Sequence, residues 1–146
     1  MIVMEFVSKT ELRVRYAETD RMGIVHHSRY YPWFEIARGD FIRQSGVSYQ
    51  EMEAAGILLP LTETGAKYIE GLKYDEEAVI DCRLAELSVA RCTFTYEVYR
   101  KSDYKLMVTG VTKHGFVDGN FRPMNLKKKH PDIWNIISEL YAGGQE

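Results

Sequence analysis

The first regular hydrophobic pattern in the chain is an alternation of apolar and polar side chains. It runs from Thr10 to Ala17 and separates two rows of residues, Leu12, Val14 and Tyr16 on one side and Glu11, Arg13 and Arg15 on the other. A period of two is typical of a strand that is buried on one face only. We therefore predict a half-buried strand over Thr10–Ala17, followed by a loop over Glu18–Gly23.

The pattern becomes helical from about Ser28 to Gln44. Apolar residues recur there at spacings of three and four, namely Tyr30, Phe34, Ala37 and Phe41, and the face is widened by Tyr31, Trp33 and Ile42. Such spacing predicts an amphipathic helix, and its many aromatic side chains indicate that it is covered on several sides. A Ser-Gly pair ends this helix. A short second helix is expected over Ser48–Ala55, with Ser48 and Glu51 forming a capping box.

Beyond Gly56 the sequence is rich in residues that favour strands, and the strand-like segments are separated by short turns. Four further strands are expected, over Ile57–Ile69, Ala78–Val89, Arg91–Arg100 and Leu106–Val117, and a closing helix over Pro131–Tyr141. Short turns between long strands favour an antiparallel meander. One long helix packed on a curved antiparallel sheet buries all of these apolar faces, so we predict an α+β fold in a single domain of residues 1–146.

Composition narrows the class of protein. The net charge of -2 argues against a protein-wide attraction to nucleic acid or to acidic membranes. The two cysteines, Cys82 and Cys92, are too few for a disulfide-built fold and are expected to be reduced. The apolar N-terminal run is short and is interrupted by Glu5, and no apolar run reaches the roughly 18 residues that span a bilayer. We therefore expect a soluble, cytoplasmic protein without a signal peptide or a membrane insertion.

The stretch AETDRMGIVHHSRYY, from Ala17 to Tyr31, holds the main candidate for chemistry. Asp20 lies shortly before Gly23, which permits a tight turn, and the predicted helix begins soon afterwards. The first amides of a helix have no partners within it and can hold a developing oxyanion. A carboxylate beside them provides a base or a nucleophile for acyl transfer to water. The alternative is an aspartate that only caps a loop.

Histidines are the next candidates. His26 and His27 are adjacent, so their side chains point in different directions, and His114 and His130 lack the spacing of metal ligands. Neither a metal site nor a cofactor is therefore expected. The sequence also lacks a G-x-G-x-x-G motif, a Walker A loop and a G-x-S-x-G elbow, which weighs against nucleotide-driven and serine-hydrolase chemistry.

Charged residues provide two further patterns. Lys127, Lys128 and Lys129 form the only basic run, which is either a solvated surface or a phosphate contact that Arg91 would join. Without an accompanying binding motif, this run does not predict nucleic-acid binding. On the long helix, two pairs of opposite charge are spaced for ion pairing along a partly exposed face: Glu35 with Arg38, and Asp40 with Arg43.

The residues around Asp20 carry a specific resemblance. The segment RVRYAETDRMGIVHHSRYYPWFEIAR resembles the N-terminal motif of the hotdog-fold acyl-CoA thioesterases of the 4-hydroxybenzoyl-CoA thioesterase and YbgC-like group. That motif is a strand, then Asp-x-x-Gly-(Ile/Val)-Val, a residue pair ending in His, and an aromatic helix with Glu and Arg. The matching positions are Asp20, Gly23, Ile24, Val25, His27, Tyr30, Glu35 and Arg38. A looser likeness extends over roughly residues 8–130.

The resemblance implies a hotdog fold, in which the sheet wraps around a long central helix. It also implies a homodimer with its site at the subunit interface, often paired again into a homotetramer. The family's catalytic carboxylate falls on Asp20 and its histidine on His27, whose backbone amide would also supply the oxyanion hole. The other implied substrate-binding residues are Gly23, Tyr30, Arg91, Lys127 and Lys128, the last three near the nucleotide phosphates.

The reaction that the resemblance implies is hydrolysis of an acyl-CoA, or of an acyl carrier protein thioester, to a carboxylic acid and a thiol. Asp20 would act either as nucleophile or as general base, and the sequence leaves both roles open. Aromatic residues at the helix start favour a short or aromatic acyl group if they line the pocket, and are core residues otherwise. Two other classes use related folds: a hydratase or dehydratase, and a non-catalytic module that binds acyl-CoA.

Overall fold

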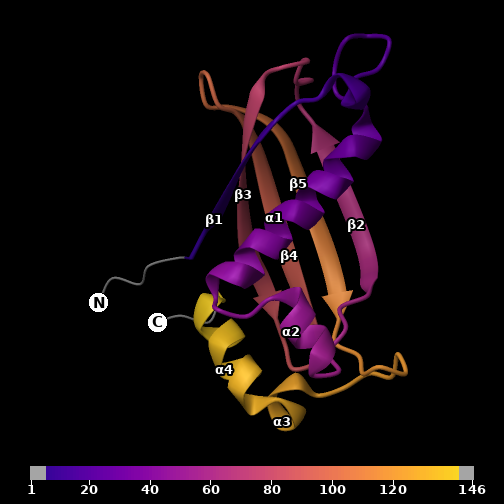
Figure 1. Cartoon of the computed structure of the whole chain (residues 1–146), viewed down its shortest axis with the longest axis vertical. Coiled ribbons are helices and arrows are strands. Elements are labelled where there is room, and N and C mark those ends of the chain that lie inside the picture. Colours follow the sequence, from indigo (N-terminus) through magenta and orange to yellow (C-terminus); the bar gives the residue numbers. More distant parts are fainter. Residues whose placement is uncertain (1–5, 142–146) are drawn as a thin grey trace.

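Among residues 6–141, which the computed structural model describes, one long helix crosses a five-stranded antiparallel sheet (Figure 1). The strands are β1 (Ser8–Arg13), β2 (Leu61–Tyr68), β3 (Glu77–Leu87), β4 (Arg91–Arg100) and β5 (Lys105–Gly115), in the order β1-β3-β4-β5-β2. The helices are α1 (Tyr30–Gln44), α2 (Tyr49–Ala54), α3 (Leu126–Lys129) and α4 (Pro131–Leu140). Residues 1–5, which make up most of the apolar N-terminal run and include Glu5, lie outside the described residues.

The first strand ends earlier than its alternation predicts. We expected it over Thr10–Ala17, but β1 is followed by a 3-10 turn over Tyr16–Glu18. Tyr16, which the alternation places on the buried row, is 77% exposed. The turn forms because the carboxylate of Glu18 accepts a hydrogen bond from the backbone N–H of Arg15 at 2.8 Å, which closes the chain on itself.

The strand order also differs from the expected meander. Strands β3, β4 and β5 pair in chain order, but β2 lies at the far edge beside β5, with Tyr68 opposite Val108. Residues 69–76, which join β2 to β3, therefore pass across the end of the sheet. A connection of this length extends up to about 26 Å, whereas three strand spacings amount to about 14 Å. Periodicity thus locates a strand without determining its neighbours.

The other predicted elements are confirmed. Helix α1 follows a 3-10 turn at His27–Arg29, close to the predicted helix start, and strands β2 to β5 and helix α4 occupy the predicted regions of the chain. The hydroxyl of Ser48 caps α2 by accepting a hydrogen bond from the backbone N–H of Glu51 at 3.1 Å. Cys82 and Cys92 are free thiols, and both are buried.

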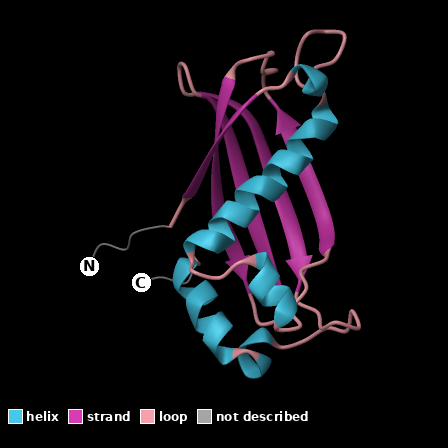
Figure 2. Cartoon of the chain, viewed as in Figure 1, coloured by secondary structure: helices cyan, strands magenta, loops and turns pink. Residues whose placement is uncertain are grey.

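Helix α1 packs closely against the middle of the sheet. The ring of Phe34 stacks on the ring of Tyr96 with a centroid distance of 4.5 Å, and both side chains are buried. Gly110 on β5 permits this contact, because a Cβ atom there would lie 2.3 Å from the Phe34 ring. The helix is therefore held tightly on the sheet, and its first turn reaches the end of the sheet at which β2 ends (Figure 2).

This contact predicts that Gly110→Ala destabilises the protein by about 1–3 kcal/mol, because the added methyl group displaces a buried aromatic ring. Gly115→Ala is the matched control on the same strand, since a Cβ atom there meets nothing within 4 Å. Urea denaturation monitored by circular dichroism measures both free energies of unfolding. Equal values for the two variants would contradict the close approach of α1 to the sheet.

Candidate active site

Residues 18–26, predicted as a loop as far as Gly23, form an ordered hairpin. The backbone N–H of His26 donates to the carbonyl of Glu18 at 2.8 Å, and the backbone N–H of Asp20 donates to the carbonyl of Ile24 at 2.8 Å. These bonds pair the two arms of the hairpin in antiparallel fashion. The chain around Asp20 is consequently held by its own backbone and does not depend on side chains alone.

The turn of the 18–26 hairpin orients the Asp20 carboxylate. Gly23 occupies the left-handed region with a φ of 82°, which a glycine adopts without strain. Its backbone N–H donates to the carbonyl of Asp20 at 2.9 Å. The carboxylate of Asp20 accepts a hydrogen bond from the backbone N–H of Met22 at 2.8 Å, which leaves its other oxygen available to a substrate.

A second segment, residues 71–73, supports the hairpin from the side. The backbone N–H of Val25 donates to the carbonyl of Leu72 at 2.8 Å, and Ile24 forms an isolated bridge with the same segment. A Cβ atom on Gly71 would lie 2.6 Å from Ile24, so glycine is required for this approach. The segment that crosses the end of the sheet therefore also holds the hairpin.

The hairpin leads directly into the 3-10 turn that precedes α1. The ring of His26, to which the sequence assigned no role, caps this turn, since its Nδ1 atom accepts a hydrogen bond from the backbone N–H of Ser28 at 3.3 Å. The backbone N–H of His27 has no acceptor among the described residues. The first turn before α1 therefore presents one unpaired backbone donor.

Glu18 joins the hairpin to α1 through a buried carboxylate. The indole Nε1 of Trp33 donates to it at 2.7 Å, and the guanidinium of Arg15 lies 3.3 Å away. Burial alone raises the pKa of the Glu18 carboxyl, but the hydrogen bonds from Arg15 and Trp33 outweigh it and hold this pKa below its ordinary value. The ionised carboxylate therefore contributes stability that is lost as the pH falls through this lowered pKa.

A cavity of about 300 Å³ lies where the hairpin, α1 and the end of β2 meet. Its lining includes Asp20, Ile24, Val25, His27, Tyr30 and Tyr68. The hydroxyl of Tyr68 donates to the carbonyl of His27 at 3.2 Å, and burial raises the pKa of Tyr30 to about 12, which keeps this phenol protonated. The structure thus brings Asp20, His27 and Tyr30 to one cavity, with Gly23 in the adjoining turn. Such a cavity suits attack on a carbonyl carbon.

The predicted phosphate contacts lie elsewhere in the chain. Lys127 and Lys128 belong to the short helix α3, and the backbone N–H of Leu126 donates to the carbonyl of Val89 at 2.8 Å, which ties α3 to the turn just before Arg91. Helix α3 is at one end of the sheet and the 18–26 hairpin is at the other (Figures 1 and 2). A single chain therefore does not bring these three basic residues to the cavity.

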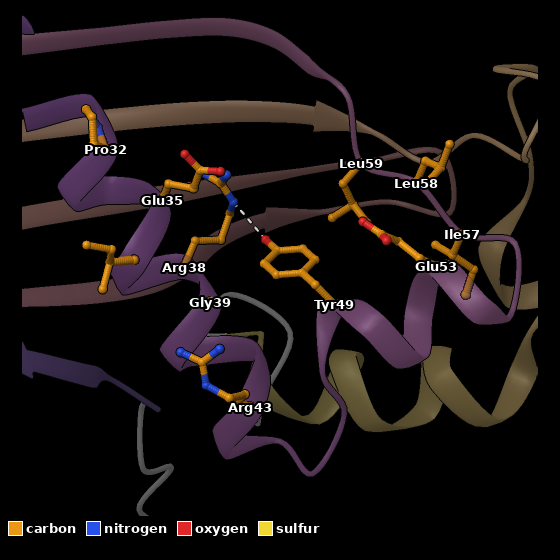
Figure 3. Close-up of a pocket in the computed structure, with 11 residues that line it drawn as sticks. Pro32, Glu35, Arg38, Gly39, Arg43, Tyr49, Glu53, Ile57, Leu58 and Leu59 are labelled. Atoms are coloured by element: carbon orange, nitrogen blue, oxygen red, sulfur yellow. Dashed lines mark hydrogen bonds between the residues drawn. The ribbon is translucent and has the colours of Figure 1, made fainter.

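The two ion pairs predicted on α1 differ in outcome. The pair between Asp40 and Arg43 forms. The predicted pair between Glu35 and Arg38 was wrong, because it is not among the ion pairs of residues 6–141. The guanidinium of Arg38 instead donates to the hydroxyl of Tyr49 at 2.7 Å (Figure 3). Glu35, Arg38 and Tyr49 border a second cavity of about 640 Å³ between α1, α2 and the segment before β2.

Sequence reasoning missed the buried polar chain that begins at Arg38. Its guanidinium donates to the hydroxyl of Tyr96 at 3.2 Å. The Tyr96 hydroxyl in turn lies 2.6 Å from the hydroxyl of Thr112. The Nε2 atom of His114 lies 2.9 Å from the same hydroxyl, and its Nδ1 atom lies 3.1 Å from the carbonyl of Leu59. Burial lowers the pKa of His114 to about 4, so this ring is neutral near neutral pH. No spacing in the sequence signals this series of hydrogen bonds, because it joins α1, β4, β5 and the segment before β2.

No group of three or more His, Cys, Asp or Glu side chains among residues 6–141 is arranged to hold a metal ion. No helix in the same range is long and apolar enough to cross a membrane.

Comparison with known proteins identifies the family to which the chain belongs. A family model described as the thioesterase-like superfamily matches residues 14–133. The chain is 35% identical over 134 residues to a putative acyl-CoA thioesterase, YneP, of Bacillus subtilis, covering 91% of this chain and 96% of the relative. It is 27% identical over 121 residues to the acyl-CoA thioesterase YbgC of Haemophilus influenzae, covering 81% of this chain and 87% of the relative.

Solved structures agree with these matches. A DHNA-CoA thioesterase from Staphylococcus aureus has a TM-score of 0.86 and 34% identity, covering 92% of this chain and 90% of that one. A hypothetical protein from Thermus thermophilus has a TM-score of 0.85 and 37% identity, covering 92% of this chain and 99% of that one. The hotdog fold expected from the resemblance is thereby confirmed. The chain belongs to the thioesterase-like superfamily, as a hotdog-fold enzyme of the acyl-CoA thioesterase class.

Proposed function

We propose that this enzyme hydrolyses an acyl-CoA thioester in the cavity at the 18–26 hairpin, with Asp20 and the backbone N–H of His27 acting on the thioester carbonyl. The observation that carries the proposal is the pairing of an oriented carboxylate with an unpaired backbone donor on the wall of one cavity. Attack on a carbonyl needs both groups, because one activates the attack and the other holds the charge that forms on oxygen.

The chemistry has two forms that use the same residues. In both, the backbone N–H of His27 stabilises the negative charge that develops on the thioester oxygen. Asp20 either attacks the carbonyl carbon to give a mixed anhydride, which water then hydrolyses, or removes a proton from the water that attacks. In each case the C–S bond breaks, the CoA sulfur takes up a proton, and the acyl group leaves as a carboxylic acid.

The cavity favours a short or aromatic acyl group. Its walls include the apolar side chains of Ile24 and Val25 and the rings of Tyr30 and Tyr68. Its volume of about 300 Å³ exceeds the roughly 150 Å³ that encloses a benzene molecule in a protein core. The name of the Staphylococcus aureus relative as a DHNA-CoA thioesterase supports an aromatic acyl group for this chain as well.

A homodimer formed through β2 would complete the site. Strand β2 is an edge strand, and Leu61 and Tyr68 at its two ends are 53% and 46% exposed. Such an edge is a template for pairing with another strand. Antiparallel pairing with a second copy, about a two-fold axis, lays the Tyr68 end of one β2 beside the Leu61 end of the other. The hairpin of one subunit would then face the α3 end of its partner.

This arrangement gives the distant basic residues a role. In the dimer, Arg91, Lys127 and Lys128 of one subunit would lie toward the cavity of the other. Cations suit the CoA phosphates, and an acyl carrier protein would present the same arm with a single phosphate.

Replacing Asp20 tests the reacting group. We expect Asp20→Asn to lower kcat roughly 10²- to 10⁴-fold with little change in KM, because the amide keeps the shape and the hydrogen bond to the Met22 N–H but neither attacks nor removes a proton. Thiol release from an acyl-CoA measures both constants. The matched control is Asp118→Asn, because the Asp118 carboxylate accepts the equivalent bond from the Asn120 N–H at 2.8 Å. Unchanged turnover in Asp20→Asn would remove this residue from the mechanism.

The His27 ring is tested separately from its backbone. His27→Ala keeps the backbone N–H, so we expect activity to survive at a reduced level and the pH dependence of kcat/KM to differ from that of the parent. The measurement is kcat/KM for the parent and for His27→Ala across the pH range, with the same acyl-CoA substrate. Identical profiles for His27→Ala and the parent would exclude the ring and leave only the backbone.

The basic run is tested with substrates that differ in their phosphates. We expect Lys127→Ala/Lys128→Ala to raise KM for an acyl-CoA roughly tenfold at unchanged kcat, since each exposed charge contact contributes about 0.7 kcal/mol. The acyl thioester of pantetheine, which carries no phosphate, should show no such increase. An equal rise in KM for both substrates would contradict a phosphate contact.

A further inference from the structure

Two carboxylates are buried in the described part of the chain, and the proposed mechanism uses neither. Glu18, the first residue of the hairpin, is 4% exposed, and Asp81, within β3, is 6% exposed. Asp81 forms an ordinary ion pair across the sheet with Lys9, at 2.9 Å. Glu18 differs because its two partners, Arg15 and Trp33, lie on the segments that precede and follow the hairpin. A buried charge is costly unless its partners satisfy it, so its placement calls for an explanation.

The side chain of Glu18 connects the end of the first strand to the long helix. Its Oε1 atom accepts from the backbone N–H of Arg15 at 2.8 Å, and its Oε2 atom accepts from the indole of Trp33 at 2.7 Å. Trp33 is itself buried in the first turn of α1. The carboxylate is therefore a rigid link between the chain before the hairpin and the helix after it.

The backbone of Glu18 also begins the hairpin. Its carbonyl accepts the N–H of His26 at 2.8 Å, the bond that closes the two arms. One residue thus fixes both arms relative to the first turn of α1. Asp20 and His27 both lie between Glu18 and Trp33 along the chain, in the loop that this link closes, so their separation depends on it.

We propose that Glu18 is a positioning residue, which holds the Asp20 carboxylate in register with the free N–H of His27. This inference rests on the proposed function, because it assigns Glu18 to the geometry of the same reaction. A misplacement of about 1 Å between reacting groups costs on the order of 10²-fold in rate. A residue with this role affects kcat far more than KM, since it does not contact the CoA.

The variant Glu18→Gln tests this role with little change in volume. An amide has one acceptor oxygen, and its NH₂ group would face at least one of the donors on Arg15 and Trp33. We expect kcat to fall about 10²-fold with KM nearly unchanged. Trp33→Phe removes one of these donors, so we expect roughly a tenfold loss. The double variant should be no slower than Glu18→Gln alone, because both changes break the same link.

Asp81→Asn is the matched control for simple destabilisation. It alters a carboxylate of similar burial that accepts a hydrogen bond from Lys9 and lies within β3, outside the hairpin. We expect it to lower the melting temperature as Glu18→Gln does, without lowering kcat. If both variants lose the same stability and Glu18→Gln keeps its kcat, the role of Glu18 is structural only and the proposal is wrong.

Hydrogen exchange provides a readout that does not require activity. In Glu18→Gln we expect the amides of residues 19–26 to exchange at least tenfold faster, and those of β4 to keep their rates; in Asp81→Asn the hairpin should be unchanged. Unchanged exchange in the Glu18→Gln hairpin would overturn the proposal. If the parent protein released no thiol from any acyl-CoA, the proposed function would fail, and this measurement would still decide whether Glu18 holds the hairpin.

Discussion

The contact on which the rest of the structure depends is the close packing of α1 on the middle of the sheet. The Phe34 ring lies flat on Tyr96 because Gly110 leaves room for it. Dense packing at this point fixes the direction of the helix, and the first turn of α1 is thereby held at the end of the sheet. Bonds within the arms of the hairpin, bonds to residues 71–73 and the bond of Glu18 to Trp33 then hold the hairpin that carries Asp20 beside that turn.

The site follows from where this packing places the helix start. An aspartate before a glycine is an ordinary turn when taken alone. Here the turn leads into α1, and the backbone N–H of His27, just before that helix, is unpaired. Asp20 and His27 both border one cavity. The same packing leaves β2 as an edge strand and puts the basic residues of α3 at the opposite end. A two-fold pairing of this edge is the arrangement that would reunite the two ends in one site.

The sequence predicted the features that depend on near neighbours. Periodicity located the long helix and the strands, and the turn-forming glycine with the motif residues placed Asp20, His27 and Tyr30 together. The sequence did not predict the contacts that are decided by residues far apart in the chain. The pairing of β2 with β5, the bond of Glu18 to Trp33 and the bond of Arg38 to Tyr96 join residues that have no fixed spacing along the chain. The predicted Glu35–Arg38 pair was wrong for the same reason, because Arg38 bonds to Tyr49 instead. Tyr16 was misplaced for a local reason, because the bond between Arg15 and Glu18 turns the chain before the predicted end of the strand.

The central claim is that the hairpin cavity breaks a thioester bond. The most direct measurement is thiol release from a panel of acyl-CoA substrates with short, long and aromatic acyl groups, run beside enoyl-CoA substrates and an acyl carrier protein thioester. The account predicts stoichiometric release of thiol and carboxylic acid, fastest for aromatic or short acyl groups. Tight binding of acyl-CoA without release, or loss of enoyl absorbance without thiol, would contradict it.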